Sequence, residues 1–269
     1  MRIVIIGQEE PVYFSPFLRR IIEARPGEVV LVVLAGDRGA GDHAATWRQT
    51  LENLYILWLI MEPYGFFRNL VIRGWHGFLK ALGPWGAFLD HRSVLAAARR
   101  YHIPVMKCRD LNSIAFVEEL RRFSPDVIIN QSELLLKDGI LSVPKIGIIN
   151  RHASLLPRFR GRLGSWWSHA GTPPEYGVTI HFVNRDIDSG PIILQKHYEI
   201  DPGASYCRVL DILFDDAPNV MMEALDKIQD PGFVPAVNPY QGTQTCLFPS
   251  LRDVKQYRNT MKKRRAGAV

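Results

Sequence analysis

The chain has 269 residues and a mass of 30.6 kDa, with 47% hydrophobic and 22% charged residues. This composition is typical of a globular protein and excludes a disordered chain, a collagen-like repeat and a coiled coil. The net charge is 33 − 27 = +6, and Lys262, Lys263, Arg264 and Arg265 lie together near the C-terminus. Such a basic tail often binds phosphate or nucleic acid, but we expect a solvated, frayed terminus.

The cysteines and the apolar runs indicate in which cellular compartment the protein lies. Cys108, Cys207 and Cys246 form no CxxC pair, so neither a disulfide framework nor a cysteine zinc site is expected. The apolar run that ends at Gly7 is too short for a signal peptide. The most apolar stretch, residues 53–61, is far shorter than the about 20 residues of a membrane span. We therefore expect a cytoplasmic protein without a transmembrane segment.

Hydrophobic periodicity in the first half predicts strands that alternate with helices. Continuous apolar runs such as residues 28–35 are typical of parallel strands covered on both faces. The predicted strands are 2–7, 28–35, 105–107, 126–130 and 147–150, and the predicted helices are 14–24, 91–102, 113–123 and 134–141. This alternation predicts an α/β fold with a doubly wound, mostly parallel sheet that binds ligands at the carboxyl ends of its strands.

Residues 45–89 interrupt the alternation. They predict two helices, 46–61 and 66–82, separated by Glu62-Pro63-Tyr64-Gly65. The segment is rich in Trp, Phe and Leu, which is compatible with a lid, a dimer face or a membrane-surface element. We expect helices packed on the core or a dimer face, because an apolar helical face is usually buried.

The second half changes in character. It predicts an Arg-, Gly- and Trp-rich loop with a helical end at 157–171, strands at 177–183 and 191–200, a helix at 204–228 with a break at 215–218, and an extended or irregular segment at 231–249. We expect residues 1–202 to form a catalytic domain, with residues 45–89 as a helical insertion within it. Residues 203–269 would then form a C-terminal helix and an extended tail.

The motifs of several large enzyme classes are absent. The glycines at positions 36, 39 and 41 have the wrong spacing and place for a dinucleotide fingerprint. Gly7 ends the first strand but is followed by Gln8-Glu9-Glu10, an acidic turn that suits phosphate poorly. The sequence contains no Walker A, HExxH or GxSxG motif. These absences weaken dehydrogenase, kinase, zinc protease and serine hydrolase interpretations.

Asn150 and His152 lie two apart at the end of a predicted strand, so their side chains share a face. An amide can hold a developing oxyanion, and an imidazole can transfer a proton or add positive charge. Asp188 follows in a turn between two later strands, and a carboxylate beside a histidine favours its protonated form. The pattern favours acyl chemistry, although Asn and Asp are also common in turns.

A metal site is a second interpretation of the same residues. His152 would need His169, His181 or Asp188 as further ligands, and no short helical or strand spacing links them. We therefore expect no metal.

Two longer runs resemble a known family. GIINRHASLLPRFRG at 147–161 resembles the first signature of the folate-dependent formyltransferases, and GVTIHFVNRDIDSGPIILQ at 177–195 resembles the second. The likeness is ordered from about Asp126 to Gln195 and looser at the first strand, and 45–89 has no counterpart in shorter members. The family includes methionyl-tRNA, glycinamide ribonucleotide and sugar N-formyltransferases. The resemblance implies a Rossmann-like fold and formyl transfer from N10-formyltetrahydrofolate to an amine, without a metal.

The resemblance also implies roles for individual residues. Asn150, His152 and Asp188 would be catalytic, with the Asn150 amide and a protonated His152 stabilising charge on the formyl oxygen. Asp188 would favour the imidazolium and relay a proton through water. His181 matches a second-signature histidine of some members, although a strand histidine is often a core residue.

Folate would bind near 132–136 and 183–188. The expected folate contacts are Ser132, Glu133, Leu134, Leu135, Asn184 and Asp186, and the expected acceptor contacts are Ser154, Arg158, Arg160 and His181. Glu133 departs from the family pattern, since most members have a small residue there. A core-facing helix start is the alternative at 134–136, and a solvated loop is the alternative for the arginines.

Two departures bear on the acceptor amine. About 70 residues follow the second signature, too few for the C-terminal domain of methionyl-tRNA formyltransferase. The acidic turn after Gly7 differs from the phosphate-binding turn of the glycinamide ribonucleotide enzyme, and 238–259 resembles the tail of sugar N-formyltransferases. We therefore expect the acceptor to be a small-molecule amine, namely a nucleotide-linked amino sugar. We also expect a homodimer that binds neither DNA nor RNA.

Three alternatives stay open. They are a methionyl-tRNA formyltransferase-like enzyme, a formyltetrahydrofolate deformylase, and an inactive protein that binds folate, a nucleotide or, through its basic tail, RNA.

Overall fold

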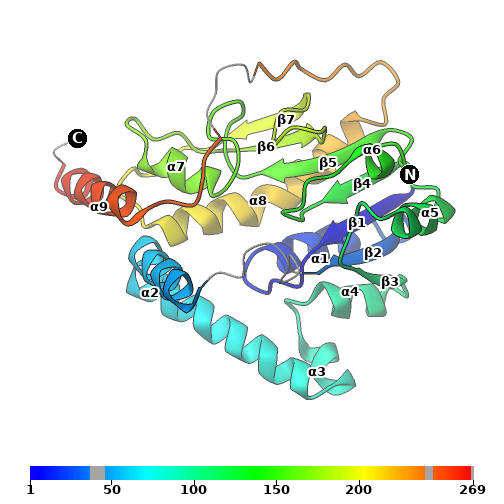
Figure 1. The fold of residues 1–269 in the computed structure, drawn as a ribbon, viewed down its shortest axis with the longest axis horizontal. Coiled ribbons are helices and arrows are strands. Elements are labelled where there is room, and N and C mark those ends of the chain that lie inside the picture. Colours follow the sequence, from blue (N-terminus) through cyan, green and yellow to red (C-terminus); the bar gives the residue numbers. More distant parts are fainter. Residues whose placement is uncertain (37–45, 240–244, 268–269) are drawn as a thin grey trace.

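The computed structural model describes residues 1–36, 46–239 and 245–267. Its strands are β1 (Ile3–Gly7), β2 (Val29–Ala35), β3 (Val105–Cys108), β4 (Val127–Asn130), β5 (Gly147–His152), β6 (Gly177–Phe182) and β7 (Ile192–His197). They form one seven-stranded sheet in the order β3-β2-β1-β4-β5-β6-β7 (Figure 1). The first five strands run parallel, β6 runs antiparallel to β5, and β7 runs antiparallel to β6.

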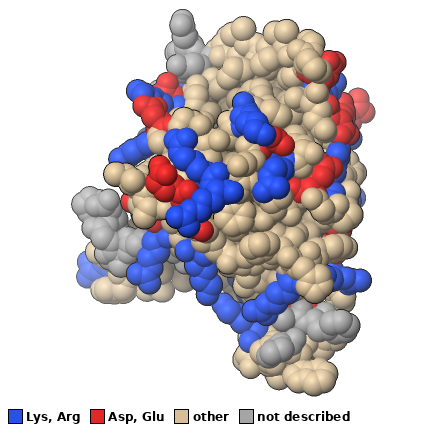
Figure 2. All heavy atoms as spheres, turned by 90° about the vertical axis from the view of Figure 1, so that its right-hand side faces the viewer, with Lys and Arg blue, Asp and Glu red and all other residues tan. Residues whose placement is uncertain are grey.

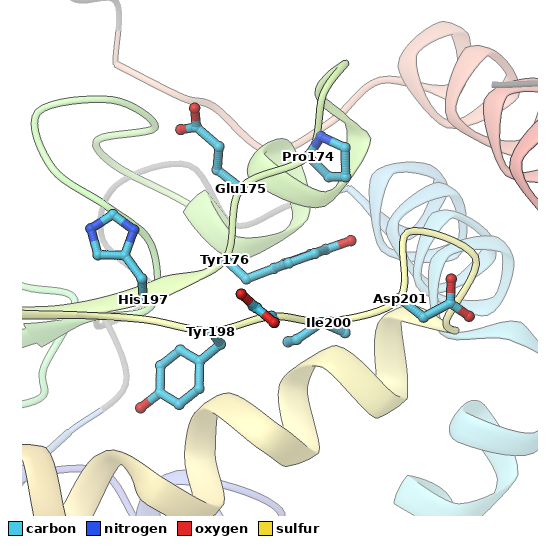
Figure 3. Close-up of a pocket in the computed structure, with 8 residues that line it drawn as sticks. Pro174, Glu175, Tyr176, His197, Tyr198, Ile200 and Asp201 are labelled. Carbon is cyan, nitrogen blue, oxygen red and sulfur yellow. The ribbon is translucent and has the colours of Figure 1, made fainter.

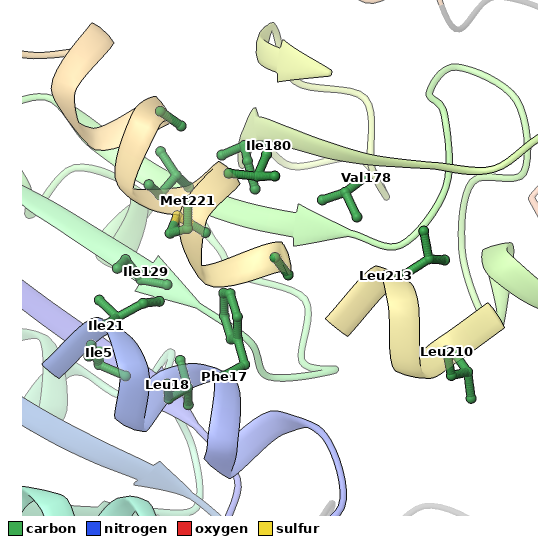
Figure 4. Close-up of a cluster of buried hydrophobic side chains, with 14 of the residues drawn as sticks. Ile5, Phe17, Leu18, Ile21, Ile129, Val178, Ile180, Leu210, Leu213 and Met221 are labelled. Carbon is green, nitrogen blue, oxygen red and sulfur yellow. The ribbon is translucent and has the colours of Figure 1, made fainter. Parts of the chain in front are cut away.

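Helices cover both faces of this sheet. They are α1 (Phe14–Ala24), α2 (Trp47–Ala81), α3 (Pro84–Leu89), α4 (Val94–Arg100), α5 (Ile114–Arg122), α6 (Asp138–Leu141), α7 (Gly164–Ala170), α8 (Tyr206–Lys227) and α9 (Leu251–Arg265). On β1, Ile5 points into a cluster with α1, α4 and α8, and Ile6 points into a second cluster with α5 and α6. Figure 4 shows Phe17 and Ile21 of α1 and Met221 of α8 in the first cluster. The predicted doubly wound, mostly parallel α/β fold is confirmed.

Two helical predictions were wrong in part. Only Asp138–Leu141 of the helix expected at 134–141 is helical. The helix expected to break at 215–218 continues through Pro218, because its buried face, including Leu213 and Met221, is held in the core. Tertiary packing there outweighs the cost of a proline inside a helix.

The expectation of a frayed basic tail was also wrong. The four basic residues end α9, which begins with a capping box formed by Ser250 and Asp253. Arg264 is buried and donates hydrogen bonds to the carbonyls of His169, at 2.7 Å, and of Gly171. Side chains of α8 and α9 belong to the same apolar cluster as side chains of the strands. The described part of 203–269 therefore shares its core with the rest of the chain.

The insertion forms α2 and α3. The predicted break is confirmed at Glu62, whose φ of 58° and ψ of 165° interrupt the helix. A Cβ on Gly65 would lie 2.9 Å from the Cys207 Cβ, so the glycine permits close packing on α8. Ile56 and Ile60 of α2 pack on the core as expected, whereas the outer face of the helix is largely exposed. Core packing thus accounts for only part of the apolar residues, and a dimer face stays a prediction. Residue 45 and two of the glycines discussed above, at 39 and 41, lie outside the described residues.

Charge is mixed over part of the visible surface. In the upper part of the face that Figure 2 shows, Lys and Arg side chains lie among Asp and Glu side chains, whereas the lower part shows Lys and Arg alone. Some of the oppositely charged side chains form ion pairs, such as Lys145 with Asp126 at 2.8 Å. No helix among the described residues is long and apolar enough to cross a membrane.

Candidate active site

The predicted residues meet at the carboxyl end of β5. Asn150 and His152 lie on β5, and the antiparallel register places His181 of β6 directly opposite Asn150. Asp188 reaches both histidines from the loop between β6 and β7. Its Oδ2 lies 3.4 Å from His152 Nδ1, and its Oδ1 lies 3.6 Å from His181 Nε2. The structure therefore brings together Asn150, His152, His181 and Asp188.

The Asp188 turn is held in an uncommon backbone conformation. Asp188 has a φ of 47°, in the left-handed region. Asn238 Nδ2 donates to the carbonyl oxygens of Asp188, at 3.1 Å, and of Gly190, at 3.0 Å. A Cβ on Gly190 would lie 1.8 Å from the Phe182 carbonyl oxygen, so only glycine fits there. The backbone amide of Gly161 completes the turn by donating to Asp188 Oδ2 at 2.8 Å.

The Asn150 amide has a fixed orientation. Gln131 Nε2 donates to Asn150 Oδ1 at 2.6 Å, and this bond turns Asn150 Nδ2 toward His181 Nε2, 3.5 Å away. Gln131 is itself fixed, because its Oε1 accepts from Arg151 Nε at 3.2 Å. The Arg151 guanidinium stacks 3.9 Å above the Phe214 ring, and burial lowers the pKa of Arg151 to about 9. The Asn150 N–H groups are thus available as oriented donors.

His152 lies between two oxygen acceptors. Its Nε2 is 2.9 Å from the Phe159 carbonyl oxygen, and its Nδ1 faces Asp188. Phe159 has a φ of 55°, which turns its carbonyl toward the ring. A Cβ on Gly164 would lie 2.7 Å from His152 Nε2, so the start of α7 must be glycine. A neutral imidazole donates to one of the two acceptors at a time, and only the imidazolium donates to both.

The ionisation of this pair differs from expectation. Burial lowers the pKa of His152 and outweighs the opposing effect of the Asp188 carboxylate. Burial alone would raise the pKa of Asp188, but His152, His181 and the Gly161 amide hold it well below its usual range. Burial therefore favours a neutral His152 in the free protein, whereas the resemblance implied a protonated His152 during the transfer itself. The two pKa shifts favour a neutral imidazole beside an ionised carboxylate.

The two segments expected to contact folate lie next to each other. Leu134 and Val183 pack on the same apolar cluster, and Arg185 forms an ion pair with Asp138. Leu135 is exposed, and its carbonyl accepts from Asn112 Nδ2 at 2.9 Å. The exposed Glu133 carboxylate lies 3.7 Å from Arg162 Nη2. Leu134 and Val183 therefore form an apolar wall, and polar groups lie along its border.

The polar members of these segments stabilise turns. Ser132 donates from its hydroxyl to Asn130 Oδ1 at 2.8 Å. Asn184 Oδ1 accepts from the Ser189 hydroxyl at 2.6 Å and from the Asp186 amide at 3.2 Å. These contacts set the backbone at the carboxyl end of β4 and in the loop that contains Asp188.

The expected acceptor contacts fall into two groups. Arg158 is exposed and forms a 2.6 Å ion pair with Glu175. Arg160 is buried, and its Nε and Nη2 donate to the Ile187 carbonyl at 2.9 and 2.6 Å. The buried Ser154 hydroxyl donates to the Phe159 carbonyl at 3.4 Å. Of these three, only Arg158 lies on the surface, and Arg160 instead supports the turn before Asp188.

Two hollows of the described surface lie apart from these residues. One, of about 690 Å³, is lined by residues 174–176 and 197–201 (Figure 3). It lies at the same end of the strands as His152. His197 of β7 pairs with Gly177 of β6, and Thr179, two residues further along β6, pairs with His152. The second, of about 620 Å³, lies between α1, α2 and α8. Neither hollow is lined by Asn150, His152 or Asp188.

Sequence reasoning missed Gln131, Arg151, Asn238 and the Phe159 carbonyl. Gln131 directly follows the predicted strand at 126–130, and that position was the available signal. Asn238 lies in a proline-rich segment far from Asp188 in sequence, so nothing local indicated its contact. Among the described residues, no group of three or more His, Cys, Asp and Glu side chains is arranged to hold a metal.

Similarity to known proteins agrees with this site. Residues 84–225, slightly more than half of the chain, match the formyl transferase family. Methionyl-tRNA formyltransferase of Parabacteroides distasonis is 32% identical over 151 residues, which is 56% of this chain and 47% of that protein. The enzyme of Thermotoga maritima is 32% identical over 137 residues, or 51% and 44%. The chain thus spans about half the length of the curated relatives it matches.

Solved structures share the fold. Glycinamide ribonucleotide transformylase 1 of Symbiobacterium toebii has a TM-score of 0.56 at 19% identity, over 88% of this chain and 94% of that one. The N-formyltransferase of Helicobacter canadensis, solved with folinic acid and dTDP-3-aminofucose, has a TM-score of 0.57 at 16% identity, over 94% and 72%. The matched residues include Asn150, His152 and Asp188. By this match and by its fold, the chain belongs to the formyl transferase family.

Proposed function

We propose that this protein transfers a formyl group from N10-formyltetrahydrofolate to a primary amine. The observation that carries the proposal is the convergence of an oriented Asn150 amide, a neutral His152 and an ionised Asp188 at the carboxyl end of β5. These groups match the demands of acyl transfer, which are a donor for the oxyanion and an acceptor for a proton.

The proposed folate site is the apolar wall of Leu134 and Val183 with its polar edge. A flat heteroaromatic ring with a hydrogen-bonding rim fits such a wall. When bound, N10-formyltetrahydrofolate supplies the formyl carbon, and its N10 is the leaving nitrogen. Ser132, Asn184 and Asp186 offer main-chain and side-chain polar groups at the rim.

The protein groups act on the charges that develop during transfer. Asn150 Nδ2 donates to the oxygen that becomes negative as the amine adds to the carbonyl carbon. His152 accepts the proton that the attacking amine loses, and Asp188 stabilises the imidazolium as it forms. The same proton then passes from His152 to the departing nitrogen, directly or through water, and the neutral imidazole is regenerated.

For the acceptor we propose a nucleotide-linked amino sugar. Arg158 is an exposed arginine beside the active-site loop, and arginine suits a diphosphate. Glu175 is its ion-pair partner, so an anionic acceptor would have to displace this carboxylate from the guanidinium. The match to methionyl-tRNA formyltransferases favours a second candidate, in which the amine is that of an aminoacyl-tRNA.

The test follows conversion of N10-formyltetrahydrofolate to tetrahydrofolate by absorbance. The full chain is assayed without amine, with nucleotide-linked amino sugars, and with methionyl-tRNA, and His152→Ala is the matched inactive control. Turnover that requires an amino sugar supports the proposal. Turnover with water alone identifies a deformylase, and turnover with methionyl-tRNA alone overturns the proposed acceptor. Equal rates for the chain and for His152→Ala contradict the proposed site.

A further inference from the structure

The insertion exposes an unusual amount of apolar surface. More than half of the exposed large apolar side chains among the described residues lie between Trp47 and Leu89. About ten half-exposed side chains of this size leave on the order of 1,000 Å² of apolar surface. The largest apolar patch on a typical monomer is roughly 300–600 Å². A surface of this size requires an occupant.

The exposed residues of the second half of α2 form one stripe. Phe67, Val71, Trp75, Phe78 and Leu82 follow one another at spacings of four, four, three and four, so they share a face of the helix. Phe67 is 55% exposed and Trp75 is 60% exposed. Leu79, one turn after Trp75, is only 2% exposed. The side of this half of α2 that packs inward therefore begins beside the stripe, and it also contains Arg68 and His76, which bond to Asp211 and Asp90.

The first half of α2 continues the same surface. Trp47, Leu51, Leu54 and Tyr55 are exposed and share a face. The ring of Trp58, one turn later, contacts the Phe67 ring at a centroid distance of 5.5 Å. The two stripes thus meet at the Glu62 kink. Figure 1 shows α2 running along the lower side of the molecule, with α3 at its far end.

The charges of the second half of this surface are of one sign, whereas the first half of α2 contains Glu52 and Glu62 beside Arg48. Residues 63–89 contain Arg68, Arg73 and Lys80 and no acidic residue. Arg68 and Arg73 are paired with acidic side chains of the protein body. Among the described residues, Lys80 has no carboxylate partner. Arg48 instead stacks over the Trp47 ring, at 5.3 Å from its centroid. Cations that border an exposed Trp-, Phe- and Leu-rich face suit an anionic surface.

We propose that the exposed apolar face of α2 and α3 binds an anionic lipid bilayer and lies in its headgroup region. Helices of this kind bury their apolar side about 5–10 Å into the boundary between headgroups and acyl chains, with Trp and Tyr at the interface. No described helix is both long and apolar enough to cross the bilayer. A second copy would bring the same acid-free segment, 63–89, against itself, which gains no charge pairing. The proposal is independent of the formyl transfer chemistry.

The test is co-sedimentation of the full chain with vesicles. One set is phosphatidylcholine mixed with phosphatidylglycerol, and the other is phosphatidylcholine alone. We expect binding to the anionic vesicles that weakens with added salt. Replacing Trp75→Glu together with Phe78→Glu should weaken partitioning roughly 100-fold, since two large apolar contacts are lost. Lys80→Glu should weaken it about tenfold, because a charge is reversed near the surface.

The matched control is Ile114→Glu with Val234→Glu. These side chains are each 83% exposed and lie outside the insertion, so the control adds the same charge without touching α2. It should bind like the unmodified chain. Absence of binding to anionic vesicles, or equal loss in the control, overturns the proposal. A lipid-free dimer that Trp75→Glu with Phe78→Glu converts to a monomer also overturns it, because a second copy would then be the occupant.

Discussion

Gln131 Nε2 donates a 2.6 Å hydrogen bond to Asn150 Oδ1, and this bond orients the amide so that Asn150 Nδ2 points toward His181. Without this bond, the Asn150 amide is free to rotate and to present its oxygen where a donor is required. An oxygen in that place would repel the developing negative charge. We therefore expect Gln131 to act as a positioning residue in the proposed formyl transfer.

Replacing Gln131→Met should lower kcat by about 10- to 100-fold while KM changes little, because the lost interaction acts in the transition state. Steady-state kinetics with the active amine measures both parameters. Gln131→Asn is the conservative control and should recover part of kcat if it still reaches Asn150. A rise in KM with unchanged kcat would instead indicate that Gln131 supports ground-state binding, and an altered melting temperature would indicate a structural role.

Asp188→Asn tests the carboxylate that faces both histidines. The amide retains nearly the same shape and can still accept from the Gly161 backbone amide at Oδ1, but it carries no charge to stabilise the imidazolium. We expect kcat to fall by about 1,000-fold or more, since comparable charge losses beside catalytic histidines have effects of that order. Circular dichroism should be unchanged. A loss below about tenfold would remove Asp188 from the mechanism.

The ionisation of His152 predicts the pH dependence. Burial lowers the pKa of His152, and the neutral imidazole is the proton acceptor in the proposed mechanism. The acidic limb of kcat/KM should therefore lie below pH 6.5, with activity falling as pH drops through the lowered pKa. Asp188 stays ionised across this range, because its own pKa is held well below its usual value.

The Asp188→Asn variant provides the matched control for this profile. Its residual activity should show an acidic limb at still lower pH, because the carboxylate that raises the pKa of His152 is gone. A pH–rate profile for both proteins measures the shift. An acidic limb above pH 6.5 in the unmodified chain would contradict a neutral His152.

Local patterns predicted the strands and the candidate residues of the site, because both depend on short stretches of sequence. The continuous apolar run of β2 predicted a buried parallel strand, and the two signatures located Asn150, His152 and Asp188. The Asn238 contact was not predictable, since it joins a proline-rich segment to a turn about 50 residues away. The continuity of α8 through Pro218 depends on its buried face, which proline rules do not take into account.

The basic C-terminus illustrates the same limit. The position at a terminus predicted a solvated tail, whereas the Arg264 guanidinium is buried and donates to the carbonyls of His169 and Gly171 at the end of α7. Arg264→Met should destabilise the fold by about 2–4 kcal/mol, because it leaves the carbonyls of His169 and Gly171 without their donors. The exposed neighbour Lys263→Met is the control and should change stability by less than about 0.5 kcal/mol. Urea unfolding measures both, and equal effects would contradict a structural role for Arg264.

His169 links that contact to acid sensitivity. Burial, followed by the charges of Arg264 and Arg265, lowers the pKa of His169 to about 4. The unfolded chain titrates near 6.5, so it binds a proton more readily than the folded protein between those values, and stability falls as pH drops through that window. A difference of about 2.5 units corresponds to roughly 3 kcal/mol lost by pH 4.

The His169→Gln variant isolates this contribution from that of His152, whose lowered pKa has the same sign. Gln does not titrate, so the variant should lose about 3 kcal/mol less than the unmodified chain between pH 7 and pH 4, whatever its stability at neutral pH. Urea unfolding at several pH values gives both curves. Parallel curves would show that His169 titrates alike in the folded and unfolded states, which a buried ring next to Arg264 does not allow.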